Sequence, residues 1–504
     1  MVKPIQVLFT LLAVAALCLL TMLVFPKEGV RINDEFTFHF ANLNELLSRD
    51  TSAVLDVDSL LNSYEEEIDS TSIKDSIKLA HAKHQQIVLN LQYHKGQTHL
   101  PNFYQSLLDL KTGKRSKVRI LHYGDSQIEG DRITSYIREK LQSEFGGSGP
   151  GMLPLMEFIP NMSIQQSQSD NWLRYTVFGR KDTTVNHNHF GLRGILSRFT
   201  PYTKDSVFTT TATSTAWVKL SPSRVSYSHA KHYRKLRLHY GYNKTAVAFT
   251  IKNGEDVVYS DSLQAVEGSS VFEYVFESTP EEITLTFTGK DSPDFYAVSL
   301  EGTSGIVMDN VAMRGSSGTI FNKISKSQLR YQYGKEPISL VILQYGGNTV
   351  PYIDSQKKAD DYGRWFGAQI QAIKLMLPNA DIVLIGPSDM AIKEKTEYVT
   401  YPFLTEVRDA LKKAAFDNGA AFWDIYEVMG GKNSIASWVS TNPPLAGPDY
   451  IHFTPKGAKR IAELFFKALD KDFTRFESSK KAEGLKNNVA DTTQTNQESA
   501  NNVE

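Results

Sequence analysis

The sequence is nearly devoid of cysteine: Cys18 is the only one among 504 residues. From Gly29 onward the chain can therefore form no disulfide, and it offers neither a thiolate nucleophile nor a cysteine metal site. This composition excludes a disulfide-stapled animal ectodomain. It is compatible with a bacterial envelope protein that faces away from the cytoplasm.

An excess of charge of either sign is also missing. The 55 Lys and Arg residues are matched by 56 Asp and Glu residues, which gives a net charge of −1 and a pI of about 6.9. A general nucleic-acid binder needs a basic surface, so we expect no nucleic-acid partner. The sequence shows no coiled-coil or solenoid period. With 41% hydrophobic and 22% charged residues, its composition is that of an ordinary globular protein.

The N-terminus is the exception to this ordinary composition. No charged residue occurs between Ile5 and Phe25, and this run is long enough to cross a bilayer core of about 30 Å as a helix. A cleavable signal peptide usually has a shorter apolar stretch, of about 7–15 residues, and no small-x-small site follows here. We therefore predict a signal anchor, or transmembrane helix, over residues 1–28. The rest of the chain is then expected outside the cytoplasm, in the bacterial cell envelope.

Two segments of the remaining chain have sequence patterns that differ from those of the rest. Apolar residues at helical spacing between Ile73 and Leu91 predict a membrane-proximal helical spacer over residues 29–97. Residues 152–300 contain short alternating runs separated by turn signals such as Asn253-Gly254, which predict an inserted all-β sandwich. Its aromatic residues are candidates either for the core or for a sugar-binding platform: Trp172, Trp217, Tyr227, Tyr233 and Tyr242.

Strands alternate with helices on both sides of this insertion. Near-continuous apolar runs such as Val118–Tyr123 and Ile338–Gln344 are typical of buried parallel strands. Residues 98–151 and 301–473 are therefore predicted to form one α/β domain with a doubly wound parallel sheet. The polar stretch 474–504 has few apolar residues and is predicted to be a disordered tail.

Polar or glycine residues follow three of the predicted strands, where ligands of such sheets gather. They are Ser126, Gly315 and Asn348. Before the last predicted helix, Asp449 lies three residues ahead of His452, so its carboxylate can accept the ring N–H and leave the other ring nitrogen free to take a proton. Taken singly, each of these residues is also explained as an ordinary turn or helix-flanking residue.

Taken together, these residues resemble the four sequence blocks of the SGNH (GDSL-type) hydrolases. The blocks are Gly124-Asp125-Ser126, Gly315, Gly346-x-Asn348 and Asp449-x-x-His452, in the same order and at the same strand ends. A β-rich insertion between the first two blocks is similar to the peptidoglycan O-acetylesterase branch, whose inserted domain is a carbohydrate-binding-like sandwich. The resemblance implies a flavodoxin-like α/β fold. Two positions depart from the common pattern, with Gln127 in place of leucine and Thr349 in place of aspartate.

The resemblance also implies a chemistry. Ser126 would be the nucleophile, His452 the base and Asp449 its partner, while the backbone N–H groups of Ser126 and Gly315 and the amide of Asn348 would form the oxyanion hole. No metal or cofactor is required. The expected activity is that of a serine esterase that removes O-acetyl or similar short acyl groups from a cell-envelope or extracellular polysaccharide, with peptidoglycan as the first choice.

Two alternatives remain open at this stage. The same Ser-His-Asp set could transfer an acyl group to a sugar hydroxyl, as an O-acetyltransferase does. The chain could also be a surface-anchored glycan-binding protein with a relic site.

Overall fold

The computed structural model describes residues 55–64, 88–180, 182–202 and 212–501, together with short pieces between residues 6 and 38. Residues up to Asp56 and those from Val57 onward form two separate units. In the first unit, strands β1 (Val30–Arg31) and β2 (Thr37–Phe38) pair antiparallel. The elements described below belong to the second unit.

The centre of the second unit is a five-stranded sheet in which all neighbouring strands run parallel. Its strand order, β15-β3-β16-β17-β20, places the first of its strands in the chain between the second and the third, as in flavodoxin-like folds. Every residue of β16 is buried, which explains its continuous apolar run. The strands are β3 (Lys117–Gly124), β15 (Gly305–Ala312), β16 (Ile338–Gln344), β17 (Asp381–Ile385) and β20 (Ala421–Trp423).

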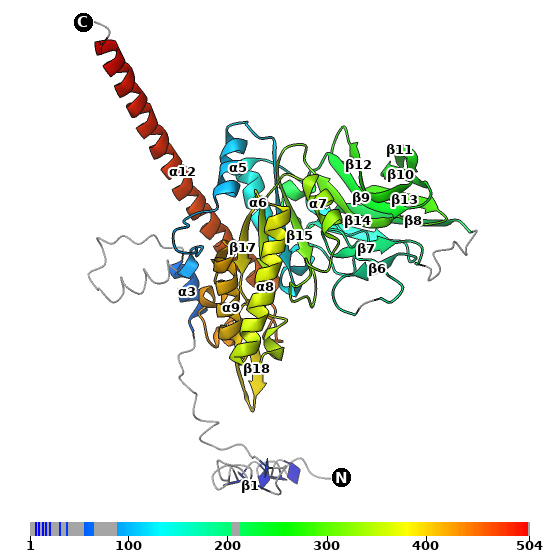
Figure 1. Cartoon of the computed structure of the whole chain (residues 1–504). Helices are drawn as coiled ribbons and strands as arrows, with labels where there is room; N and C mark the ends of the chain where they lie inside the picture. Colours follow the sequence, from blue (N-terminus) through cyan, green and yellow to red (C-terminus); the bar gives the residue numbers. More distant parts are fainter. Residues whose placement is uncertain are drawn as a thin grey trace. The chain divides into compact units, whose positions relative to one another are not determined.

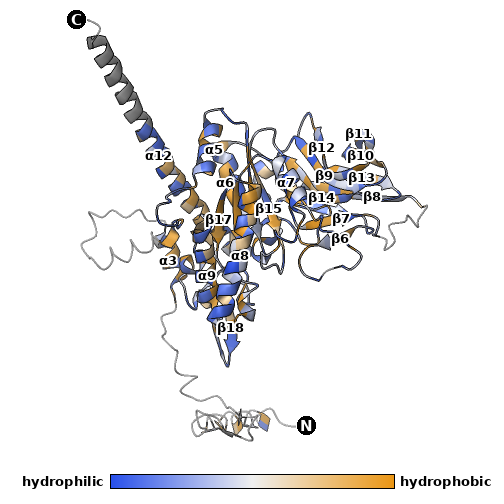
Figure 2. Ribbon diagram, viewed as in Figure 1, coloured by the Kyte–Doolittle hydropathy of each residue, from blue (hydrophilic) through white to orange (hydrophobic). Residues whose placement is uncertain are grey.

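Helices cover this sheet in two groups. Helices α8 and α9 run side by side, whereas α12 packs against α5 and α6 (Figure 1). In Figure 2, β15 and β17 are largely orange and much of α8 is blue, as expected for buried strands and a half-exposed helix. The helices are α3 (Val57–Ser63), α5 (Pro101–Lys111), α6 (Thr134–Phe145), α7 (Lys326–Gly334), α8 (Gln356–Met376), α9 (Leu404–Asp417), α10 (Ile425–Val428), α11 (Ser434–Ser440) and α12 (Pro455–Asn501).

The insertion is a sandwich of two antiparallel sheets, with strand orders β11-β10-β13-β8-β5 and β12-β9-β14-β7-β6, and with β4 paired to β14. The α/β fold with a β insertion is therefore confirmed. The strands are β4 (Gly151–Leu153), β5 (Ile164–Gln168), β6 (Leu173–Thr176), β7 (Ile195–Arg198), β8 (Ser214–Pro222), β9 (Lys235–Asn243), β10 (Val247–Asn253), β11 (Asp256–Leu263), β12 (Val266–Val275), β13 (Ile283–Gly289) and β14 (Asp294–Glu301).

The five aromatic candidates of the sandwich divide between core and surface. Trp172 and Tyr233 are buried in its core. Trp217 is partly exposed, Tyr227 packs edge-on against Tyr136 of α6, and Tyr242 stacks on a histidine ring.

A buried ionic cluster joins the sandwich to the central sheet. Arg119 of β3 is fully buried, and its guanidinium contacts Asp309 of β15 and Glu336, each at 2.8 Å, and Glu301 at the end of β14. Arg237 of β9 contacts Glu336 as well. Because the sheet supplies Arg119 and Asp309 while the sandwich supplies Glu301 and Arg237, the two parts share one set of charges.

The charges of this cluster stabilise one another in the ionised state. Burial raises the pKa of Glu301, but the attraction of Arg119 and Lys117 outweighs burial and lowers that pKa to about 2. Removing Arg119 would leave Asp309, Glu301 and Glu336 buried without their common partner, which costs far more than losing an exposed ion pair.

Part of the predicted spacer docks on the α/β part. Gln92 forms a β-bridge with Phe422 of β20, and the indole N–H of Trp423 donates to the Leu89 carbonyl at 2.9 Å. The Tyr64 hydroxyl, next to α3, donates to the Val428 carbonyl at 3.1 Å. Most of the helix predicted between Ile73 and Leu91 lies outside the described residues.

The predictions for the two chain ends compare differently with the structure. Among the described helices, none has the length and apolarity needed to cross a bilayer. The run Ile5–Phe25, predicted as an anchor, lies largely outside the described residues. At the other end, the stretch predicted as a disordered tail over 474–504 is instead helical, because α12 continues to Asn501. Residues 502–504 lie outside the described part.

The longer α12 has a local explanation. Phe473 and Phe476 pack their rings against Tyr104 of α5, so the apolar face of the helix continues past residue 474, where the tail was predicted to begin. Lys481 and Glu477 then pair across one helical turn, and no proline follows Pro455. These contacts could not be predicted from composition alone.

The ionic cluster leads to a stability prediction. Arg119→Met should lower the free energy of unfolding by about 3–5 kcal/mol, because it leaves three buried carboxylates without their common partner. Urea unfolding of the purified protein measures this change. Lys219→Met is the matched control, since it breaks an exposed pair with Glu282 in the sandwich and should leave the unfolding midpoint nearly unchanged. Equal effects of the two substitutions would contradict the role assigned to the cluster.

Candidate active site

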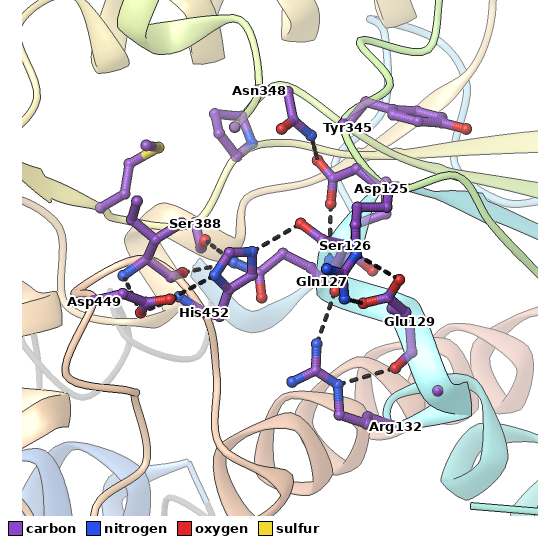
Figure 3. Close-up of a pocket in the computed structure, with 18 of the residues that line it drawn as sticks. Asp125, Ser126, Gln127, Glu129, Arg132, Tyr345, Asn348, Ser388, Asp449 and His452 are labelled. Atoms are coloured by element: carbon purple, nitrogen blue, oxygen red, sulfur yellow. Dashed lines mark hydrogen bonds and ion pairs between the residues drawn. The ribbon is translucent and has the colours of Figure 1, made fainter. Parts of the chain in front are cut away.

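The turn after β3 presents Ser126 at the carboxyl edge of the sheet. Ser126 is the first residue of the short helix η1 (Ser126–Asp131), and the side chain of Asp125 caps this helix by accepting from the Gln127 N–H at 2.9 Å. Arg132 Nη2 donates to the Ser126 carbonyl at 2.7 Å and thereby holds the turn from the other side. The serine hydroxyl is left free to point toward His452 (Figure 3).

A hydrogen-bonded relay connects Ser126 to Asp449. Ser126 Oγ lies 2.8 Å from His452 Nε2, and His452 Nδ1 lies 2.7 Å from Asp449 Oδ2 (Figure 3). The other carboxylate oxygen of Asp449 accepts from the backbone N–H groups of Ile451 and His452, at 3.0 and 3.1 Å. The carboxylate therefore fixes both the ring and its loop, and the ring can donate to Asp449 while accepting from Ser126.

The electrostatics of the relay keep Asp449 ionised. Partial burial raises the pKa of this carboxyl, but hydrogen bonds from the ring and backbone of His452 and from the Ile451 backbone outweigh burial and hold the pKa below its ordinary value. An ionised Asp449 stabilises a positive charge on His452 when the ring takes up a proton.

A β-hairpin supports the loop that carries His452. The hairpin consists of β18 (Ala391–Glu394) and β19 (Glu397–Thr400), and the Ala391 N–H donates to the Tyr450 carbonyl at 3.0 Å. The ring of Tyr398 stacks on that of Tyr450 with 3.5 Å between centroids. These contacts hold Tyr450 at φ +56°, a left-handed conformation that a tyrosine rarely adopts without support.

Asn348 and Gly315 follow the two strands that flank β3. Asn348 Nδ2 donates to Asp125 Oδ2 at 3.1 Å and to the Ser316 carbonyl at 3.3 Å, so the amide is tied to both neighbouring turns. Gly315 has φ +76° and Gly346 has φ +126°, conformations that favour glycine. Thr349, which replaces the aspartate of the common pattern, closes the turn with a backbone hydrogen bond to Gly346.

These residues line one pocket of about 700 Å³. Ser126, Gly315, Asn348, Asp449 and His452 all contribute to its wall, so the structure brings together every site residue predicted from the sequence.

The rim of the same pocket carries three further side chains. Glu129 and Arg314 form an ion pair there, and Tyr352 is 78% exposed. The pocket is thus open to solvent at a rim that combines charged and aromatic groups.

Two residues that tie the Ser126 turn to the His452 loop were not predicted. Gln127 Nε2 donates to the Ile451 carbonyl at 2.7 Å, and Gln127 Oε1 accepts from the Phe453 N–H at 3.4 Å. Arg132 Nη1 donates to the Phe453 carbonyl at 2.9 Å. The sequence offered one signal for Gln127, which stands where the common pattern has leucine. A glutamine amide can hydrogen-bond to two backbone groups at once, whereas a leucine side chain cannot.

Asp125 is a third unpredicted residue of the site. It is 4% exposed, and burial raises the pKa of its carboxyl to about 6, against the opposing effects of the Gln127 N–H, His452 and Asn348. Its two oxygens accept from different donors, Oδ1 from the Gln127 N–H and Oδ2 from the Asn348 amide. The carboxylate thus orients the amide that was predicted as an oxyanion donor.

Comparisons with known proteins add a fold-level relationship. Neither the models of known protein families nor the curated protein sequences contain a match to this chain. Among solved structures, a peptidoglycan O-acetylesterase is similar with a TM-score of 0.57 and 22% sequence identity, over 74% of this chain and 96% of that one. The chain therefore has an SGNH hydrolase-like fold, as predicted. That neighbour is an esterase, the class of enzyme that the sequence also predicts.

Two more solved structures align over smaller parts of the chain. An acetyl xylan esterase aligns at 19% identity, with 32% of this chain and 81% of that chain covered and a TM-score of 0.25. A GDSL-like lipase from Parabacteroides merdae aligns at 16% identity, with 33% and 73% of the two chains covered and a TM-score of 0.24.

The raised pKa of Asp125 leads to a pH prediction. Because its folded-state pKa of about 6 exceeds the ordinary value of 3.8, the stability that the neutral form contributes is fully present below pH 3.8 and is lost as the pH rises through 6. Asp125→Asn removes this titration. The stability of the variant relative to the wild type should therefore grow by about 3 kcal/mol between about pH 4 and pH 7.

The same variant should lose turnover. An asparagine has one acceptor oxygen in place of two, so it cannot serve both the Gln127 N–H and the Asn348 amide. Urea unfolding across the pH range measures the first effect and ester hydrolysis the second. A stability difference that does not change with pH would contradict the account of Asp125.

Proposed function

We propose that the protein is a serine esterase that removes O-acetyl groups from an extracytoplasmic polysaccharide, with peptidoglycan as the first choice. The observation that carries this proposal is the Ser126–His452–Asp449 relay, with contacts of 2.8 and 2.7 Å, in the wall of an open pocket. The fold shared with a peptidoglycan O-acetylesterase supports the choice of substrate.

In the first half of the reaction, Ser126 Oγ attacks the ester carbonyl while His452 Nε2 takes the hydroxyl proton. Asp449 stabilises the imidazolium that results. The carbonyl oxygen becomes an oxyanion, for which the donors are the backbone N–H groups of Ser126 and Gly315 and the amide of Asn348. The Asn348 amide donates two hydrogen bonds within the protein. The bond to the Ser316 carbonyl, at 3.3 Å, is the longer of the two, and the oxyanion replaces it.

The intermediate then collapses and transfers the acetyl group to Ser126. His452 gives its proton to the departing sugar oxygen, which leaves as a hydroxyl group, and an acetyl-serine ester remains. In the second half, His452 takes a proton from water as the water attacks this ester. Acetate leaves, and the proton returns to Ser126.

Hydrolysis is favoured over acyl transfer by the exposure of the relay. The side chains of His452 and Asp449 are 38% and 48% exposed, so water reaches the base that must activate it. A transferase has to keep water away from its acyl-enzyme. The intact relay also favours an active enzyme over a binding protein with a relic site.

The location is a further part of this proposal. The uncharged run Ile5–Phe25 would anchor the chain in the membrane and leave the catalytic part outside the cytoplasm, in the bacterial cell envelope. Fractionation of cells that produce the full chain tests this point. Recovery with the membranes is expected, and recovery in the cytoplasmic fraction would contradict it.

Removal of the nucleophile tests the proposed activity. Ser126→Ala should abolish acetate release from O-acetylated peptidoglycan, because no other group of the relay can form the acyl-enzyme. Acetate is measured after incubation with purified protein. Ser143→Ala should keep full activity, because this exposed serine of α6 donates its hydroxyl to the Glu139 carbonyl of the same helix. Unchanged acetate release by Ser126→Ala would overturn the assignment.

A companion variant separates the oxyanion role from substrate binding. Asn348→Ala keeps the relay and removes one donor, so kcat should fall by about 10²–10³ with little change in KM. An effect confined to KM would mean that Asn348 binds the substrate in its ground state.

A further inference from the structure

A second pocket adjoins the catalytic one. Its volume is about 600 Å³, and it shares four lining residues with the catalytic pocket: Glu129, Gly130, Ile159 and Arg314. Its other walls come from β6 and β7 of the sandwich and from the loop between β4 and β5. We call this space the junction groove, because the α/β part and the sandwich both line it.

Four arginines line the junction groove, and two of them have carboxylate partners. Arg314 pairs with Glu129, and Arg138 pairs with Asp131. For the other two, Arg174 and Arg193, no carboxylate among the described residues lies within ion-pair distance, 4.0 Å. The lining carries these four arginines against three carboxylates, Glu129, Asp131 and Glu157, and so has one net positive charge.

Arg193 is the buried member of this unpaired set. Only 4% of its surface is exposed. Its Nη1 donates to the carbonyls of Met152 and Asn310, at 2.9 and 3.0 Å, and this fixes the guanidinium between the sandwich and the central sheet. Its Nε has no acceptor among the described residues. An orphaned donor on a buried guanidinium is costly unless a ligand satisfies it.

Arg174 of β6 is placed beside it. Its Nε also lacks an acceptor among the described residues. Burial lowers the pKa of Arg193, the attraction of Glu157 and Asp309 opposes this shift, and the repulsion by Arg174 adds to it. The one unpaired acid of the groove, Glu157, uses an oxygen to accept from the N–H groups of Phe158 and Ile159. Two like charges held together in this way favour an anion between them.

An aromatic side chain completes the groove. Phe158 is 64% exposed at its edge, in the same loop as Glu157. An exposed ring next to guanidinium donors suits a sugar unit, because the apolar face of the sugar can pack on the ring while its charged substituent meets the arginines.

We propose that the junction groove binds a sugar carboxylate of the polysaccharide chain whose acetyl group occupies the catalytic pocket. This inference rests on the proposed esterase function and makes its substrate an acidic glycan. Arg174 and Arg193 would bind the carboxylate by charge-assisted hydrogen bonds, and Phe158 would contact the ring. The sandwich thereby contributes directly to the choice of substrate.

The test compares two forms of one substrate. Peptide-free O-acetylated peptidoglycan strands are used with their carboxylates free, or with the carboxylates converted to neutral methylamides. Acetate release gives kcat/KM for each form. The wild type should prefer the free carboxylate form by about tenfold or more. Arg174→Gln should bring this preference close to one, mainly through KM, and high salt should weaken it in the wild type.

A matched control accompanies this variant. Arg224→Gln makes the same charge change at an exposed position of the sandwich that does not line the groove, and it should keep the wild-type preference. Equal rates on the two forms in the wild type, or a preference that survives Arg174→Gln, would overturn the inference while leaving the esterase function standing. No acetate release from either form by the wild type would contradict the esterase function and the inference together. If Arg174→Gln fails to fold, the wild-type ratio and its salt dependence decide the question.

Discussion

The hydrogen bond between Ser126 and His452 is the constraint on which the site depends. It joins the start of the short helix η1 to the loop before α12, 326 residues further along the chain. Gln127 and Arg132 supply the connection, since both reach from the serine turn to the backbone around His452. These local hydrogen bonds therefore preorganise the relay, while the fold brings the two segments close to one another.

Much of this fold could be predicted because the signals were local. The run Ile338–Gln344 is a buried parallel strand, as its near-continuous apolar sequence predicted. The three elements of the relay could be recognised because their residue types, order and strand-end positions together match a known pattern. The sandwich could be predicted from alternation and turn residues.

What could not be predicted depends on contacts between distant segments. Arg119 lies within an apolar strand and shows no sign in the sequence of the three carboxylates that surround it, because they come from separate parts of the chain. Asp125 belongs to the recognised motif, yet its role in orienting Asn348 follows only from the closeness of two strand ends. The helical end of α12 was missed because its contacts with α5 are invisible to composition.

The sandwich and the α/β part work as one unit around the site. The Arg119 cluster fixes their relative placement, and the junction groove opens next to the catalytic pocket along the same boundary. A sandwich placed in this way can influence which glycan unit reaches Ser126 without supplying a catalytic group. This explains why an insertion between the first two sequence blocks is compatible with an intact relay.

The central claim is that Ser126 is a nucleophile activated by His452. Reaction of the full-length protein with a serine-directed phosphonate, followed by mass spectrometry of its peptides, tests this claim most directly. We expect a single label on Ser126, and much slower labelling in His452→Ala. A wild-type protein that stays unlabelled at Ser126, or a His452→Ala variant labelled as fast as the wild type, would contradict it.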